Sequence, residues 1–296
     1  MLHTVAKLHY EQEMSQVDIA KRLGLSAATI SRLLQRARAE GIVRIEIRDL
    51  VAPDELVRDL KERLGLKDAA VVETGGMVDA LAAPVGEMLR AAPLREGSVL
   101  AIGWGRAVRA VVEAGLPPIP GVLTVPATGG MQQPAPHFQV SEFTRLAARH
   151  LQGAPCFIHA PYLPTAAARA ALLADPTIAA GVALWNRVDA ALVGIGLPHA
   201  KTAPDASPAT PDEQALAEVA GDVIRHYFDA AGQLADWEGE RRMIAMSPDQ
   251  LRRTPLVIGV ATGEAKAAAI LGAIRAGFVS ALATDIRTAE AVLALV

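Results

Sequence analysis

Three short glycine-containing stretches each follow an apolar run and precede a helical pattern, a placement that suits anion binding. They are Gly103-Trp104-Gly105-Arg106, Thr128-Gly129-Gly130 and Gly263-Glu264-Ala265-Lys266. Glycine lets backbone N–H groups approach an anion, and the start of a helix adds positive partial charge. Arg106 and Lys266 could each add a charge-assisted hydrogen bond. Ordinary tight turns and a surface lysine account for the same residues, so the pattern alone leaves both interpretations open.

Two carboxylates could accept hydrogen bonds from sugar hydroxyls. Asp222 follows Gly221, and Asp229 lies in the run 227–232, although helix caps or turns would use the same residues. The sequence has no His-x-x-x-His pair, no Gly-x-Ser-x-Gly elbow and no Gly-x-x-x-x-Gly-Lys-Ser/Thr loop. It therefore predicts no metal, no cofactor and no hydrolytic nucleophile. Cys156 is expected to be inert in a buried strand.

The elements that must position these residues alternate between strand and helix from residue 69 onward. The apolar runs predicted as strands are 69–73, 98–102, 122–125, 156–159, 190–194, 256–261 and 280–284. Helical patterns lie at 78–92, 106–114, 141–151, 166–174, 213–227, 265–276 and 286–295, and four prolines predict a long loop over 197–211. This alternation predicts an α/β fold with a doubly wound, mostly parallel sheet, in which ligands bind at the carboxyl ends of the strands.

The first 50 residues carry a different pattern, in which two helices are joined by a tight glycine turn. After a short helical run at 4–12, Ser15 can cap a helix that Gly24 ends. A further helix begins at Ser26 and carries apolar residues at helical spacing. Residues 43–48 then alternate between apolar and charged, like a half-exposed strand. This order of elements predicts an N-terminal winged helix-turn-helix, a fold that places one helix in the DNA major groove.

The helix that follows Ser26 has hydroxyl and guanidinium groups on the face away from its apolar stripe. Ser and Thr bond bases or phosphates, and Arg can read guanine through two hydrogen bonds. Residues 15–48 hold seven Lys and Arg against three Asp and Glu; since the whole chain carries −3, this segment carries +4 and the remainder −7. The alternative is a three-helix bundle with a solvated basic face. The combined pattern predicts DNA contacts from Ser26, Thr29, Arg32 and Arg36.

Length and composition limit the remaining possibilities. A chain of 296 residues, 51% of them apolar, suggests two domains of about 150 residues on average, each able to bury a core. We expect a DNA-binding domain over 1–52 and a larger domain over 53–296, whose helix at 53–66 is a linker or a dimer contact. The single cysteine excludes an intrachain disulfide. The apolar runs fall short of the roughly 18 residues that a membrane span needs, and no signal pattern is present, so a cytoplasmic protein with no membrane partner is expected.

Both parts of the chain carry runs of residues that together resemble the SorC family of bacterial transcription regulators. In the N-terminal part these are Val5-Ala6-Lys7-Leu8-His9-Tyr10, Ser15-Gln16, Ile19-Ala20, Leu23-Gly24, Ser26, Thr29-Ile30-Ser31-Arg32-Leu33-Leu34, Ala37-Arg38 and Glu40-Gly41-Ile42-Val43. In the larger part they are Gly103-Trp104-Gly105-Arg106, Gly194-Ile195-Gly196, Gly221-Asp222, Tyr227-Phe228-Asp229, Gly232, Lys266, Leu282 and Thr284-Asp285. The resemblance covers nearly the whole chain.

The resemblance implies a sugar-responsive regulator of carbohydrate metabolism that binds palindromic double-stranded operator DNA as a homo-oligomer, a dimer or a tetramer. Its larger domain would be similar in fold to sugar-phosphate isomerases, bind a phosphorylated sugar effector, and have no catalytic turnover. The resemblance adds Ser15, Gln16 and Ser31 to the expected DNA contacts. For the effector it implies contacts from Gly103, Trp104, Gly105, Arg106, Gly129, Gly130, Asp222 and Lys266.

Two positions depart from the family pattern, and two other functions remain possible. Ala107 stands where the family often has a hydroxyl residue, and Ala27 where it often has Arg, so one phosphate bond and one DNA contact are expected to be missing. One alternative is a sugar-phosphate isomerase or deaminase with an appended DNA-binding domain, in which Asp222 or Asp229 would be a general base. The other is a non-specific DNA-packaging protein, which the negative charge of the larger domain disfavours.

Overall fold

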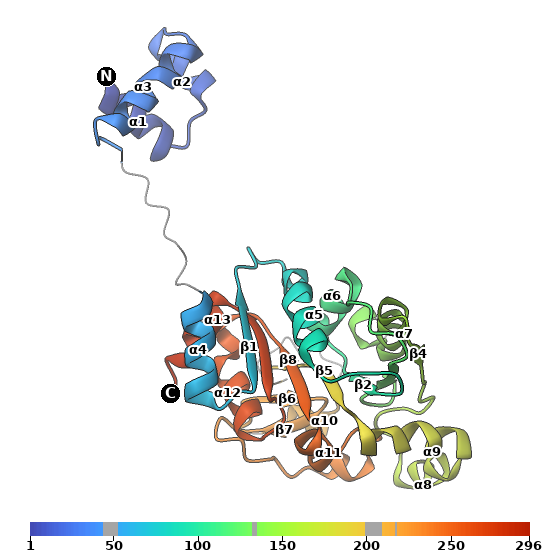
Figure 1. The fold of residues 1–296 in the computed structure, drawn as a ribbon. Helices are drawn as coiled ribbons and strands as arrows, with labels where there is room; N and C mark the ends of the chain where they lie inside the picture. The colour runs from blue at the N-terminus through green and yellow to red at the C-terminus, as the bar shows by residue number, and fades with distance from the viewer. Residues whose placement is uncertain (44–52, 132–134, 199–208, 217) are drawn as a thin grey trace. The chain divides into compact units, whose positions relative to one another are not determined.

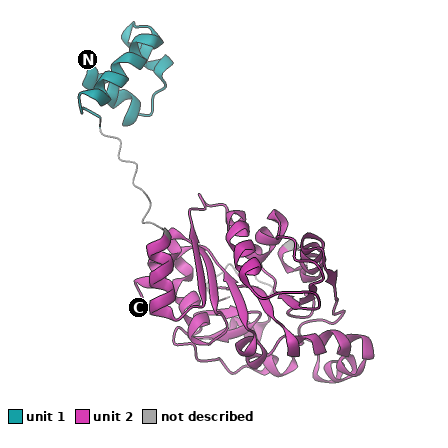
Figure 2. Ribbon diagram, in the orientation of Figure 1, with its two compact units in different colours: residues 1–50 teal, residues 51–296 magenta. Residues whose placement is uncertain are grey.

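The chain forms two compact units, residues 1–50 and 51–296 (Figure 2). The computed structural model describes residues 1–43, 53–131, 135–198, 209–216 and 218–296. The first unit consists of the helices α1 (Leu2–Tyr10), α2 (Gln16–Leu23) and α3 (Ala27–Ala39). The prediction of an N-terminal helix-turn-helix is confirmed. The strand expected at 43–48 lies, from residue 44 onward, outside the described residues.

Side-chain caps and one glycine turn define the helices of the first unit. The Ser15 hydroxyl accepts a hydrogen bond from Asp18 N at 3.1 Å, and the Ser26 hydroxyl accepts one from Thr29 N at 3.1 Å. Between these two caps Gly24 adopts φ 68°, the left-handed conformation that ends α2. The apolar stripes of the three helices then meet in a small core that includes Val5, Leu8, Ile19, Ile30 and Leu34.

The second unit is built on a seven-stranded sheet. Its strands are β1 (Asp68–Val72), β2 (Val99–Ile102), β3 (Leu123–Pro126), β4 (Ala154–Pro155), β5 (Ala190–Gly194), β8 (Leu256–Val260) and β9 (Ala281–Asp285). Their order is β1-β9-β8-β5-β2-β3-β4, and every pairing is parallel. The predicted α/β fold with a doubly wound parallel sheet is confirmed (Figure 1).

Helices cover both faces of this sheet, and each face has its own core. One core joins α5 (Ala82–Ala91), α6 (Arg106–Ala114) and α7 (Val140–Leu151), and the other joins α4 (Pro53–Leu64), α12 (Ala267–Arg275) and α13 (Ile286–Leu293). Along β5 the side chains alternate between them: Ala190 and Leu192 enter the first core, Ala191 and Val193 the second. Burial of both faces explains why the strands read as continuous apolar runs.

The remaining elements lie at the ends and margins of the sheet. They are η1 (Val78–Leu81), η2 (Pro136–Phe138), α8 (Ala166–Ala174), α9 (Pro176–Ala183), η3 (Leu184–Arg187), α10 (Pro211–Gln214), β6 (Gly221–Val223), β7 (His226–Phe228), η6 (Glu238–Arg242), α11 (Pro248–Arg253) and η7 (Glu264–Lys266). Among the described residues no single helix is long and apolar enough to cross a membrane; one pair, α8 with the segment 176–187, meets the length and composition test together but is bent by 87°.

The prediction of a helix over 213–227 is wrong. Among the described residues of this range only 213–214, the end of α10, are helical, and β6 and β7 form an antiparallel two-stranded hairpin. Its two-residue turn places Ile224 at φ 45° and Arg225 at φ 71°. Val223, Tyr227 and Phe228 are fully buried, and β-branched and aromatic residues favour strands in such surroundings. Asp222 therefore lies on a strand rather than on a helix.

The prediction of a strand over 156–159 is also wrong, because β4 ends at Pro155. The ladder between β3 and β4 stops after Cys156 N donates to Thr124 O at 2.7 Å. The next residue of β3 facing β4 is Pro126, which has no N–H to donate. The carbonyl of Pro126 accepts a hydrogen bond from Trp185 Nε1 at 2.9 Å instead. The segment that follows Cys156 therefore has no partner on β3 with which to extend the strand.

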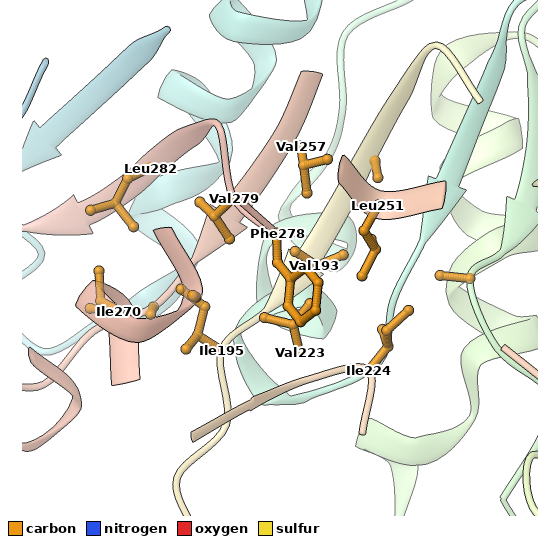
Figure 3. Close-up of a cluster of buried hydrophobic side chains, with 14 of the residues drawn as sticks. Val193, Ile195, Val223, Ile224, Leu251, Val257, Ile270, Phe278, Val279 and Leu282 are labelled. Atoms are coloured by element: carbon orange, nitrogen blue, oxygen red, sulfur yellow. The ribbon is translucent and has the colours of Figure 1, made fainter. Parts of the chain in front are cut away.

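Phe278 lies in the middle of the larger core, and Figure 3 shows its ring among side chains from β5, the hairpin, α11 and α12. Val193, Val223, Leu251 and Ile270 are among the surrounding residues, all buried. The ring also makes an edge contact with Phe228 of the hairpin at 5.9 Å. This core therefore fixes the hairpin against the sheet.

Replacing Phe278 by Ala is expected to lower the free energy of unfolding of the larger unit by about 3–5 kcal/mol, because it removes a fully buried ring and leaves a cavity. Leu295→Ala is the control, since Leu295 is 51% exposed and its loss should change stability by about 0.5 kcal/mol or less. Denaturant unfolding followed by circular dichroism measures both. Equal losses in the two variants would contradict this description of the core.

Candidate effector and DNA-binding sites

The direction of winding reverses between β2 and β5, and in open parallel sheets such a reversal marks the expected place of a ligand crevice. From β2 the chain continues to β3 and β4 on one side, whereas from β5 it continues to β8 and β9 on the other side. In open parallel sheets ligands bind at the carboxyl ends of two such strands, where the winding reverses. The stretch 103–106 directly follows β2, and Gly194-Ile195-Gly196 ends and follows β5. Two of the predicted motifs therefore meet at this point.

Three charged side chains from separate elements converge at this end of β5. Lys266 Nζ donates to Ile195 O at 2.8 Å, and Asp222 pairs with Gly196 through backbone hydrogen bonds in both directions. Burial lowers the pKa of Lys266, and the nearby positive charge of Arg106 lowers this pKa further, while Asp222 acts in the opposite sense. Lys266, which is partly buried, thus lies near one carboxylate, Asp222, and near a second cation, the exposed Arg106.

Asp222 is held in a narrow space beside β5. Its Oδ2 accepts a hydrogen bond from Arg225 N at 3.0 Å, and the residue is 7% exposed. A Cβ on Gly196 would lie 2.0 Å from Asp222 Oδ1, so only glycine fits opposite this carboxylate. A Cβ on Gly221 would lie 2.6 Å from Gly196 O. The glycines at 196 and 221 therefore permit the approach that places Asp222 at the crevice.

The loop after β2 leads directly into α6. Gly105, just before the helix, has φ 119°, a conformation that favours glycine, and α6 begins at Arg106. The N–H groups of a first helical turn have no partner within the helix and attract anions. Gly105 N donates to His137 O at 3.0 Å. Burial and the charges of Arg106 and Arg109 lower the pKa of His137, as expected beside a positive site.

The glycines of the second stretch have a different structural use. Gly129 N donates to Ile244 O at 2.7 Å and Gly130 N donates to Ala160 O at 2.8 Å. A Cβ on Gly129 would lie 2.5 Å from Ala160 O, so close backbone packing accounts for that glycine. Both amides are thus engaged within the protein. The assignment of Gly129 and Gly130 to the effector stays a prediction.

Arg225 is a residue of this region that sequence reasoning missed. Its side chain is 3% exposed, forms an ion pair with Glu213 at 3.4 Å, and lies over the ring of Trp104 at 5.5 Å. Trp104 itself is buried and makes an edge contact with Tyr162 at 5.3 Å. The one available signal was its place three residues after Asp222, because residues three apart share one face of a helix.

Asp229, Cys156 and a metal site are the remaining possibilities for chemistry, and the described residues support none of them. Asp229 Oδ1 accepts hydrogen bonds from Ala231 N and Gln233 N and so closes a turn. Cys156 is half-buried just after β4, and burial raises the pKa of its thiol, which disfavours the reactive thiolate. Across the described ranges no group of three or more His, Cys, Asp and Glu could hold a metal ion.

The first unit presents its candidate DNA contacts along α3 and at the start of α2. Arg32 and Arg36 are exposed on α3, where Arg32 Nε reaches Ala28 O at 3.4 Å and Arg36 Nε pairs with Glu40 at 2.6 Å. The hydroxyls of Ser26 and Thr29 bond each other at 2.8 Å at the N-terminus of the helix. Ser31 is half-buried, and Ser15 and Gln16 stand at the start of α2.

Comparisons with known proteins match both parts of the chain. A family model described as "Putative sugar-binding domain" matches residues 48–294, and one described as region 4 of sigma-70 matches residues 7–40. The sorbitol operon regulator of Klebsiella pneumoniae is 33% identical, over 98% of this chain and 96% of that protein. The transcriptional regulator LsrR of Enterobacter sp. (strain 638) is 30% identical, over 98% of this chain and 92% of its own length. The crystal structure of full-length SorC from Klebsiella pneumoniae matches with a TM-score of 0.76 at 31% identity, covering 99% of this chain and 97% of that one.

A helix-turn-helix unit joined to a sugar-binding domain defines a class of sugar-binding transcription regulators. The chain belongs to the SorC family of sugar-binding transcriptional regulators. The predicted family is therefore confirmed. These relatives are regulators and not enzymes, so the isomerase or deaminase alternative is set aside.

Arg32→Ala is expected to weaken binding to specific operator DNA by about 1–3 kcal/mol, because it removes an exposed guanidinium from the side of α3 that is predicted to face the DNA groove. Arg58→Ala is the matched control, since Arg58 is an exposed arginine of α4 in the other unit. Fluorescence anisotropy at fixed salt measures both affinities. An unchanged affinity in Arg32→Ala, or an equal loss in the control, would refute the role assigned to Arg32.

Proposed function

We propose that the protein is a sequence-specific DNA-binding regulator of carbohydrate metabolism whose affinity for operator DNA is controlled by a phosphorylated sugar. The observation that carries the proposal is the convergence of Arg106, Lys266 and Asp222 at the carboxyl ends of β2 and β5. A site with two cations and one carboxylate suits a ligand that has both an anionic group and hydroxyl groups. A phosphorylated sugar combines the two.

Each group of the site has a distinct role in this proposal. The phosphate binds at the start of α6, where the backbone N–H groups and Arg106 supply positive charge. Lys266 approaches from η7 and neutralises the rest of the anion. Asp222 accepts hydrogen bonds from sugar hydroxyls, which an ionised carboxylate can do with both oxygens. Trp104 and the loop at 129–130 complete the wall of the site.

The chemical class of the sugar is proposed from the names of two relatives. One is named for a sorbitol operon and another is a deoxyribonucleoside regulator. A hexitol 6-phosphate and deoxyribose 5-phosphate are therefore the first probes, each beside its unphosphorylated form. We further propose that the protein acts in the cytoplasm, as a dimer or tetramer on palindromic operators.

Control of DNA binding requires unequal affinity of the effector for two arrangements of the protein. A ligand that binds the DNA-competent and the incompetent arrangements equally shifts nothing, however tightly it binds. Coupling of about 1–3 kcal/mol between the two sites is typical of such regulators. By reciprocity, operator DNA changes the affinity for the sugar phosphate by the same factor.

Thermal unfolding with the phosphorylated and free sugars tests the ligand class. A ligand at 100 times its Kd stabilises the folded state by about 2.7 kcal/mol, so one phosphorylated sugar should raise the Tm while its free form has little effect. Lys266→Met should abolish this shift. Lys67→Met is the control, because Lys67 Nζ also donates to a backbone carbonyl, Pro255 O at 2.7 Å. Lys67 stands at the amino end of β1, whereas the proposed site lies at the carboxyl ends of β2 and β5.

Two outcomes would contradict the proposal. The first is a Tm that no phosphorylated sugar raises in the wild-type protein. The second is a shift that persists unchanged in Lys266→Met, which would mean that the ligand binds elsewhere.

The lowered pKa of Lys266 predicts the pH dependence of effector affinity. The anion needs the charged ammonium, so affinity should fall as the pH rises through the pKa of Lys266, at a lower pH than an ordinary lysine, whose pKa is about 10.4, would give. Lys266→Arg should move this loss to higher pH, because arginine stays charged. Isothermal titration calorimetry from about pH 7 to about pH 10 measures the effector affinity of the wild-type protein and of Lys266→Arg. Identical pH profiles for the two proteins would contradict this prediction.

A further inference from the structure

We propose that Arg225 positions the proposed effector site, with Glu213 as its required counter-ion. The inference rests on the proposed function for the class of ligand, whereas its geometric part stands on the contacts of Arg225 alone. Arg225 and Glu213 lie outside the glycine-containing stretches and outside the runs that resemble the family. Neither residue is proposed to touch the ligand; both act through the groups that do.

The backbone of Arg225 orients the carboxylate of the site. Arg225 is the second residue of the β6–β7 turn, and its N–H donates to Asp222 Oδ2 at 3.0 Å. Ile224 and Arg225 both have positive φ, 45° and 71°, a region in which glycine is favoured. An arginine in a conformation that suits glycine indicates that the side chain has a use there.

The guanidinium of Arg225 contacts the first glycine-containing stretch, 103–106, and the residue that follows the second stretch, 128–130. Its plane centre lies 5.5 Å from the ring of Trp104, between Gly103 and Gly105, and its Nη2 lies 4.0 Å from the sulfur of Met131, which follows Gly130. On the remaining sides Tyr162 lies at 5.9 Å and the Tyr227 hydroxyl lies 3.0 Å from Nη1. One buried cation therefore fixes the loop after β2, the loop after β3 and the hairpin relative to one another.

Glu213 supplies the negative charge that this buried cation needs. Its carboxylate lies 3.4 Å from Arg225 Nη1 and accepts hydrogen bonds from Tyr227 OH at 2.8 Å, Tyr162 OH at 3.2 Å and Thr210 N at 2.7 Å. The side chain of Glu213 is fully buried. Through this carboxylate, α10 becomes part of the support of the site.

Stability alone does not account for a buried ion pair at this place. Apolar residues of similar volume often stabilise a core as well as or better than a buried ion pair, whereas loss of one partner is strongly destabilising. A planar guanidinium does what apolar groups cannot, because it stacks on two rings while it donates hydrogen bonds in fixed directions. The pair is therefore suited to holding Trp104 and Asp222 in defined positions.

Arg225→Lys and Glu213→Gln test the proposal with conservative changes. Lysine keeps the charge but loses the planar stacking and the fixed fork of donors, and glutamine keeps the size but loses the charge. Both should weaken binding of the hexitol 6-phosphate or deoxyribose 5-phosphate, whichever the wild type binds, by about tenfold or more, as loss of orienting partners does in metal sites. Arg252→Lys is the matched control, since Arg252 also stacks on a ring, Phe278 at 5.4 Å, and donates to Ala276 O.

A second readout needs no ligand. The emission of Trp104 is obtained as the difference between each protein and the same protein carrying Trp104→Phe. Acrylamide quenching of this emission should increase in Arg225→Lys and in Glu213→Gln but not in Arg252→Lys. Operator binding without effector should stay unchanged in all three variants, and unchanged far-UV circular dichroism shows that the second unit, in which all three lie, is folded.

The outcomes separate this proposal from the proposed function. Wild-type affinity together with wild-type quenching in both site variants would overturn the positioning role, as would equal losses in the Arg252→Lys control. If wild type binds no phosphorylated sugar, the proposed ligand class fails, and the quenching result alone then decides whether Arg225 positions Trp104. Variants that lose thermal stability but keep full affinity and quenching would reduce the pair to a structural role and so contradict the proposal.

Discussion

The close approach of the β6–β7 hairpin to the end of β5 is the constraint on which the site depends. It is possible only because residues 196 and 221 are glycines, each of which would otherwise place a Cβ within 2.6 Å of another atom. The approach brings Asp222 beside the strand whose next carbonyl, Ile195 O, accepts from Lys266. Without it, the carboxylate and the lysine would not share one crevice.

The charges around this crevice balance only in part. Arg225 is neutralised by Glu213 inside the protein, so its charge serves the structure of the site. Burial lowers the pKa of Lys266, and the charge of Arg106 lowers it further, while Asp222 acts in the opposite sense. A partly buried lysine with a shifted pKa beside a second cation is an arrangement found at functional sites. The same reasoning links the positive site to an anionic ligand and explains why that ligand should stabilise the folded domain.

The sequence was sufficient for the elements whose signals are local. The caps at Ser15 and Ser26, the turn at Gly24 and the span of α6 are set by neighbouring residues, and the structure places them where their patterns predict. The alternation of apolar strands and helices likewise predicted the parallel sheet, because burial on both faces leaves a distinct pattern.

The β6–β7 hairpin could not be predicted from the sequence, because its conformation depends on packing against residues far away along the chain. Residues 221–228 are buried on all sides, and a short buried run does not distinguish a helix from a strand by periodicity. The contacts of Arg225 could not be predicted for the same reason, because its partners Trp104, Tyr162 and Glu213 come from distant parts of the chain. No local pattern could bring these four residues together.

The most direct test of the account is the affinity for operator DNA, selected from random duplexes, measured by fluorescence anisotropy with and without a saturating hexitol 6-phosphate or deoxyribose 5-phosphate. The account predicts that one phosphorylated sugar changes the operator affinity of the wild-type protein by about 5- to 150-fold, and that Lys266→Met binds the same DNA with no change on adding the sugar. An operator affinity that responds to no phosphorylated sugar, or that responds equally in Lys266→Met, would contradict it.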